Sequence, residues 1–113
     1  MLAKEQESTG FGGIIKPYRL LEGCTIQQFL MKLRRNKDVV VSAIERSNGC
    51  GCGCCGTVHH DLRELADASC SLSGTYFIEA RYNEQEVQIS FSDRGTITLF
   101  TTDPLLELTK IIR

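Results

Sequence analysis

Apolar residues between Thr25 and Arg34 recur at helical spacing. They stand at positions i, i+3, i+4 and i+7, so a helix would carry all of them on one face. Thr25 and Gln28 have the spacing of a capping box, in which each side chain binds the other residue's backbone amide at the start of a helix. The pattern predicts a helix over residues 25–34 with one buried stripe, formed by Ile26, Phe29, Leu30 and Leu33.

Strand patterns fill much of the remaining chain. Residues 39–44 are a β-branched run, which predicts a buried strand. Pro17 limits the apolar run over residues 12–21 to an edge strand or an extended arm. Beyond Gly74, apolar and polar positions alternate in three segments joined by short polar turns, which predicts an antiparallel meander with one face exposed to water. The alternating residues are Tyr76, Ile78, Ala80 and Tyr82, then Val87, Ile89 and Phe91, then Ile97 and Leu99.

Two further helices are expected. Thr57 can cap a helix that runs to about Ala68. Asp103 and Pro104 supply an N-cap and a proline at the first helical position of a last helix. The apolar stripe of this last helix is Leu105, Leu108 and Ile112.

Together the elements indicate an α+β fold, a two-layer sandwich with helices on one face of a mostly antiparallel sheet. Residues 1–12 are polar and contain glycine, and we expect a flexible tail there. Residues 13–113 would form a single domain that carries a cysteine-rich loop over residues 49–56. With 113 residues and 42% hydrophobic content, the chain can bury a core without a metal or disulfide staple, so a bound metal would be functional rather than structural.

Charge and hydropathy narrow the classes of partner. The formal net charge is -1, from 13 basic and 14 acidic residues spread along the chain, which argues against nucleic acid. The N-terminus carries charges where a signal peptide needs an apolar core, and no stretch has the length of a membrane span. We therefore expect a cytoplasmic protein without a membrane partner, whose cysteines stay reduced and indicate metal or redox chemistry.

Four of the six cysteines lie within six positions, interleaved and flanked by glycines. Glycine removes side-chain bulk and permits positive φ, so such a backbone can turn several sulfur atoms toward one centre. The loop also precedes the helix expected from Thr57, whose N-terminal dipole would stabilise thiolates. The pattern predicts a thiolate metal site whose ligands are Cys50, Cys52, Cys54 and Cys55.

The close spacing of these cysteines limits which metal they can bind. Structural zinc usually takes two separated Cys-x-x-Cys pairs, whereas this loop offers only Cys52 with Cys55. Soft thiolates placed close together suit an iron-sulfur cluster or copper(I), so the expected cofactor is an iron-sulfur cluster, with zinc or copper(I) as alternatives. Candidate additional ligands are His59, His60, Cys24 and Cys70.

Two other functions remain open on the same residues. Cys52 and Cys55 also have the spacing of a redox pair, and vicinal Cys54 and Cys55 could close a strained disulfide, so thiol redox chemistry or persulfide transfer is one alternative. The other is an oligomeric interaction module whose loops share a metal between copies. We expect a protein partner in each case. No Ser-His-Asp arrangement, carboxylate pair or phosphate loop rises above background, which favours a binding protein over an enzyme.

Two short segments resemble known families. Asn48 and the run Cys50-Gly51-Cys52-Gly53 resemble the signature of the A-type (HesB-like) iron-sulfur carriers, whose thiolates hold a cluster for transfer. Residues 77–104 are similar to the C-terminal hairpin and closing helix of E1-like adenylyltransferases of the ThiF/MoeB type, which act on sulfur-carrier proteins. This second resemblance implies a sulfur-handling context, without the nucleotide-binding domain that performs adenylation.

Overall fold

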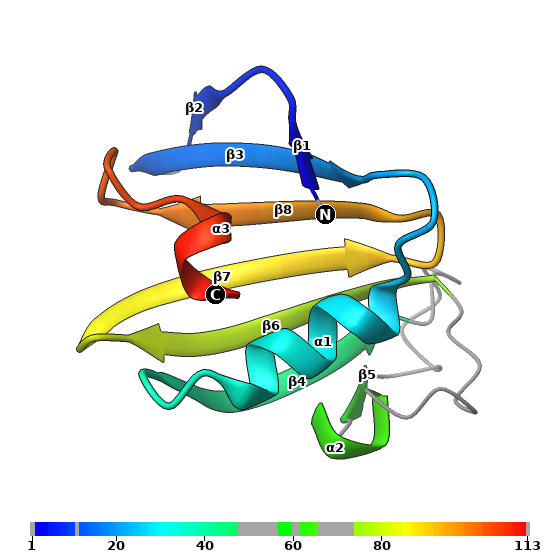
Figure 1. The fold of residues 1–113 in the computed structure, drawn as a ribbon. Helices are drawn as coiled ribbons and strands as arrows, with labels where there is room; N and C mark the ends of the chain where they lie inside the picture. The colour runs from blue at the N-terminus through cyan, green and yellow to red at the C-terminus, as the bar shows by residue number, and fades with distance from the viewer. Residues whose placement is uncertain (1, 11, 48–56, 60–61, 66–73, 113) are drawn as a thin grey trace.

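The computed structural model describes residues 2–10, 12–47, 57–59, 62–65 and 74–112, and their strands form one antiparallel sheet (Figure 1). The strand order is β1-β3-β8-β7-β6-β4-β5, and β2 also pairs with β3. The strands are β1 (Leu2–Lys4), β2 (Ser8–Gly10), β3 (Gly13–Leu20), β4 (Val39–Ser47), β5 (Thr57–His59), β6 (Thr75–Tyr82), β7 (Gln85–Ser92) and β8 (Thr96–Thr101). The helices are α1 (Ile26–Arg35), α2 (Leu62–Leu65) and α3 (Leu108–Ile111).

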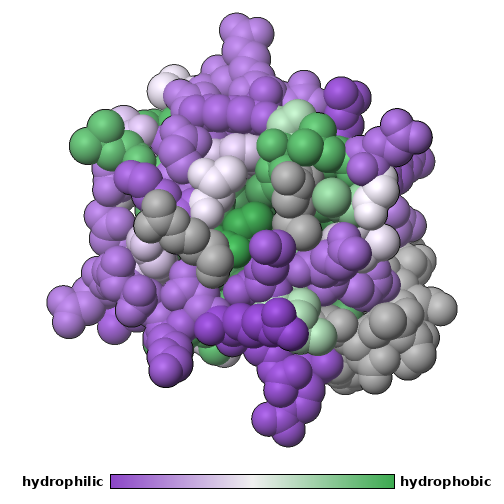
Figure 2. Space-filling view, viewed as in Figure 1, coloured by the Kyte–Doolittle hydropathy of each residue, from purple (hydrophilic) through white to green (hydrophobic). Residues whose placement is uncertain are grey.

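The predicted two-layer α+β architecture is confirmed. The helices α1 and α3 lie on the same face of the sheet (Figure 1). Alternate residues of β6, β7 and β8 are buried. Figure 2 shows this helical side from outside as mostly hydrophilic, with hydrophobic groups confined to patches. The core therefore lies between the helices and the sheet; from the helices it includes Phe29, Leu30, Leu33, Leu108 and Ile111, and from the sheet Ile44, Tyr76, Ile78, Ile89, Phe91, Ile97 and Leu99.

The helix predicted over residues 25–34 is confirmed as α1. Thr25 is its N-cap, and its hydroxyl accepts from the Gln28 amide at 3.2 Å while the Gln28 side chain accepts from the Thr25 amide at 3.1 Å. This capping box satisfies two amides that the first turn cannot pair internally. The predicted stripe is buried.

The predicted strand over residues 39–44 and the predicted meander are confirmed as β4 and as β6, β7 and β8. The β6–β7 hairpin turns at Asn83 and Glu84, whose φ angles of 49° and 69° are the left-handed values that a two-residue hairpin turn requires. β6 also pairs with β4, so the meander and β4 together form the centre of the sheet.

Residues 1–12 were expected to form a flexible tail, and the structure instead gives this segment two strands. β1 and β2 both pair with β3, which therefore has neighbours on both sides and is not an edge strand. The geometry of β3 explains why it accepts Pro17. The carbonyl oxygen of Pro17 accepts from the Glu5 amide at 2.9 Å, and in an antiparallel strand the N–H of a residue points to the same side as its carbonyl. The N–H that proline lacks would therefore point to the side where β1 and β2 are interrupted.

The last helix begins later than Asp103 and Pro104 suggested. The Asp103 carboxylate accepts from the Leu105 amide at 2.9 Å in a local turn, and α3 starts only at Leu108. A helix starting at Pro104 would pair the Pro104 carbonyl with the Leu108 amide. In the structure that amide donates to the Tyr18 hydroxyl at 3.1 Å and that carbonyl accepts from Lys16, so tertiary contacts replace the expected helical turn.

Candidate functional site

The predicted ligands Cys50, Cys52, Cys54 and Cys55 lie outside the described residues, and so do His60 and Cys70. The structure does describe the two strands that flank the cysteine-rich segment, β4 before it and β5 after it. β4 enters it at Ser47 and β5 leaves it at Thr57, and these two residues are paired in an antiparallel register. Residues 48–56 therefore connect two neighbouring strand positions, whose Cα atoms lie about 5 Å apart in such a pair.

One basis for the predicted site is wrong, because the segment does not lead into a helix. Thr57–His59 forms β5, and the next helix, α2, begins at Leu62. Thr57 and Val58 are β-branched and pair with the otherwise open edge of β4, which outweighs the helix-capping tendency of threonine. The stabilisation of thiolates by a helix dipole directly after the loop is therefore lost.

Two of the additional candidate ligands lie on described backbone. His59 is on β5, in register with Glu45 of β4, two positions beyond the pair that closes the segment. Cys24 precedes α1, is half-buried and free, and lies at the same end of the sheet as Ser47 because every strand from β3 to β4 is antiparallel to its neighbour. It borders a hollow of about 510 Å³ beside the β7–β8 turn.

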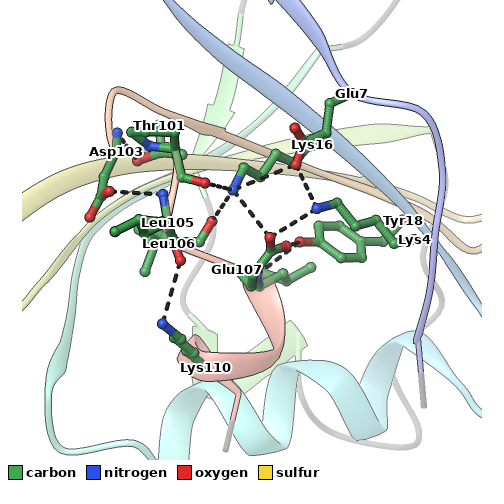
Figure 3. Close-up of polar contacts among 12 residues, drawn as sticks. Lys4, Glu7, Lys16, Tyr18, Thr101, Asp103, Leu105, Leu106, Glu107 and Lys110 are labelled. Carbon is green, nitrogen blue, oxygen red and sulfur yellow. Dashed lines mark hydrogen bonds and ion pairs between the residues drawn. The ribbon is translucent and has the colours of Figure 1, made fainter.

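Sequence reasoning missed a polar cluster under the C-terminal segment, which we name the Lys16 cluster (Lys4, Glu7, Lys16, Tyr18 and Glu107; Figure 3). Lys16 is fully buried, and its ammonium group donates to the carbonyl oxygens of Pro104 at 2.7 Å and Leu106 at 2.6 Å. It also donates to Oε1 of Glu107 at 3.3 Å. In the sequence, the only sign of this cluster is that Lys16 and Tyr18 stand two positions apart, so that both would lie on one face of a strand.

The other members of the cluster are satisfied in the same way. Glu107 accepts from Lys4 at 2.8 Å through Oε1 and from the Tyr18 hydroxyl through Oε2. Lys4 also forms an ion pair with Glu7. The ammonium group of Lys16 has three N–H donors, and all three bond to oxygens of the protein, so none is left for a substrate. The cluster holds the segment before α3 against β3.

The Lys16 cluster gives the fold a specific pH dependence. Hydrogen bonds from Lys4 and then Tyr18 lower the pKa of Glu107 from 4.5 to about 2, so ionised Glu107 stabilises the fold above about pH 4.5 and this contribution is lost as the pH falls toward 2. Burial and then the Glu107 hydrogen bond raise the pKa of Tyr18 from 10.0 to about 12, so its contribution is lost as the pH rises through that interval.

We expect wild-type protein to lose more stability between pH 4.5 and 2 than Glu107→Gln, which cannot lose a charge there. Denaturant titrations of both proteins across this interval measure the difference. The comparison is needed because two other carboxylates also have lowered pKa values. A hydrogen bond from Lys4 lowers the pKa of Glu7, and a hydrogen bond from the Leu105 amide lowers the pKa of Asp103. Parallel pH curves for the two proteins would contradict the assignment to Glu107.

Among the described residues, no group of three or more His, Cys, Asp or Glu side chains is placed to hold a metal ion. No helix in the described ranges is long and apolar enough to cross a membrane. No protein-family model matches the chain, and comparison with curated proteins and with solved structures gives no match. The case for a function therefore depends on the residues of this chain and on the frame around its cysteine-rich segment.

Proposed function

We propose that this chain is a small cytoplasmic metal-binding protein that holds an iron-sulfur cluster through Cys50, Cys52, Cys54 and Cys55. The bound cluster would serve electron transfer, cluster delivery or sensing, and zinc or copper(I) are the alternative ions. The observation that carries the proposal is the concentration of four thiols in the nine residues, 48–56, that join two paired strand ends.

The pairing of Ser47 with Thr57 supports this proposal through the entropy of binding. A chain segment whose two ends are already fixed side by side has lost part of its conformational freedom before any ligand binds. A metal that binds thiols of this segment carries no further cost for bringing the two ends together. The same four cysteines on a long open loop would carry a larger ordering cost.

The strand β5 bears on the choice between metal binding and thiol reactivity. A reactive thiol needs a lowered pKa, and the helix dipole that was expected to supply it does not follow the segment. A metal ion needs no such help, because it displaces the thiol protons itself when it binds. This difference favours a metal or cluster site over thiol redox chemistry or persulfide transfer.

A cluster-binding protein of this kind requires a protein partner that supplies or receives the cluster. A second copy of the chain is another source of ligands if fewer than four thiols of one segment bind the same centre. The mass of the native protein before and after removal of metal separates these arrangements. A homo-oligomer that dissociates with loss of metal indicates shared ligands.

Thiol protection tests the proposal without assuming which metal is bound. We expect the four cysteines of residues 48–56 to resist iodoacetamide in anaerobically purified protein and to become alkylated after a chelator removes the metal. Peptide mass spectrometry reads each site. Half-buried Cys24, which lies outside this segment, is the internal comparison, because its labelling should not change with the chelator if the four loop thiols are the only ligands. Rapid labelling of one loop cysteine below the usual thiol pKa would instead support thiol redox or persulfide chemistry.

A further inference from the structure

The face of the sheet away from α1 and α3 carries a hollow of about 440 Å³ over β6, β7 and β8. Two phenylalanines border it, Phe77 of β6 and Phe100 of β8, and the smaller side chains of Ser90 and Thr98 lie between them. Such a volume falls within the range of small-ligand pockets. The hollow is open on its outer side, where Phe77 is 49% exposed.

The register explains why the sheet is hollow at this place. Ser90 of β7 lies directly opposite Phe77 on one side and Thr98 on the other, so a small side chain stands beside a large ring. Phe100 is in register with Gln88, one position along the same face from Ser90. The two rings therefore rise from strands on either side of β7, with a lower floor between them.

The ring of Phe100 is held in place by the absence of a side chain at Gly13. A Cβ atom on Gly13 would lie 2.7 Å from Cζ of Phe100, so the ring occupies the space that any other residue would fill. Ile15, the register partner of Phe100 on β3, also lines the hollow. This wall of the hollow is thus set by packing rather than by a freely moving side chain.

Charge determines which ligands suit the hollow. Glu79 is the charged residue that lines it, and it lies on the exposed side of β6. The serine and threonine hydroxyls can accept or donate, but the carboxylate repels anions. The flanking pair Arg81 and Glu86 is also charged, so a second sheet packed flat on this face would bury charges. The occupant is therefore small.

We propose that the hollow binds a small organic cation, an ammonium group carried on an aromatic or alkyl body. The apolar body would lie between the rings of Phe77 and Phe100, and the cation would be attracted by the ring faces and by the Glu79 carboxylate. This site does not depend on the cysteine-rich segment. Binding here and metal binding there can each fail without the other.

The test is a backbone NMR titration of the full chain with 3-phenylpropylammonium, the neutral 3-phenyl-1-propanol and the anionic 3-phenylpropanoate. We expect the cation to shift amides of residues 77–79, 88–90 and 98–100, and to bind about three- to fivefold more tightly than the alcohol. The anion should bind most weakly. Equal affinity for all three, or shifts outside these strands only, would overturn the proposal.

Three variants locate the interactions. Glu79→Gln should abolish the preference for the cation, whereas Glu84→Gln removes the same charge from the β6–β7 turn, outside the hollow, and should leave the preference unchanged. Phe77→Ala should weaken cation and alcohol alike, and its exposed position allows the fold to persist. An equal effect of the two glutamate variants would show general electrostatic attraction and would also overturn the site.

Discussion

Replacing Lys16 with methionine is expected to lower the free energy of unfolding by about 3–5 kcal/mol, the loss typical of removing one partner from a buried charged network. Methionine fills a similar volume but donates no hydrogen bond. The carbonyls of Pro104 and Leu106 would lose their donor, and Glu107 would lose one of its cations. A loss of this size is a large fraction of the stability of a small domain.

Equilibrium denaturation by urea, followed by circular dichroism, measures the effect of Lys16→Met. Lys4→Met is the matched control, because Lys4 pairs with the same Glu107 oxygen from an exposed position and should contribute far less. Tyr18→Phe provides a milder probe, since it deletes one hydroxyl that bonds both Glu107 and the Leu108 amide. Equal stability of wild type and Lys16→Met would contradict the structural role of the Lys16 cluster.

Serine in place of Cys52 is expected to remove most of the bound metal or cluster, since a hydroxyl is a poor ligand for soft metals. Cys50→Ser, Cys54→Ser and Cys55→Ser should do the same if all four thiols bind one centre. The fold should survive in each variant, because the buried core lies between α1, α3 and the sheet. Iron, sulfide and zinc analysis of purified variants, together with circular dichroism, separates loss of metal from loss of fold.

Cys24→Ser is the control for these variants, because Cys24 lies outside residues 48–56, on the connection between β3 and α1. We expect its metal content to equal that of the wild type. Metal loss in Cys24→Ser alone would move the site to the β3–α1 connection. Full metal content in every loop variant would contradict the ligand assignment.

Periodicity predicted those parts of the fold in which local pattern and burial agree. The stripe of α1 and the alternation in β6, β7 and β8 follow from residues that stand three, four or two positions apart. These elements set the two-layer architecture. A capping box fixed the start of α1 because both of its residues act locally.

Prediction from sequence was wrong where distant contacts decide the conformation. Threonine often caps helices, but pairing with Ser47 places Thr57 in a strand. Asp103 and Pro104 begin a turn because Lys16 and Tyr18, nearly ninety positions earlier, take up the groups that a helix would use. The N-terminal strands likewise exist through pairing with β3, which their own polar sequence does not indicate.

For the candidate site, the sequence supplies the proposed ligands but not their surroundings. Four cysteines between glycines indicate thiolate chemistry from composition and spacing alone, and their number limits the metals that fit. That the segment joins paired ends of β4 and β5 depends on which strand β5 contacts, a fact of tertiary structure. The Lys16 cluster was missed because one lysine in a strand gives no sign of the carbonyls that surround it.

The most direct test of the proposed function is iron and acid-labile sulfide analysis, with an absorption spectrum, of protein purified without oxygen. An iron-sulfur site predicts iron and sulfide in stoichiometric amounts and charge-transfer absorbance in the visible region. A colourless protein that contains no iron, zinc or copper, and whose four cysteines in residues 48–56 all titrate freely, would contradict it.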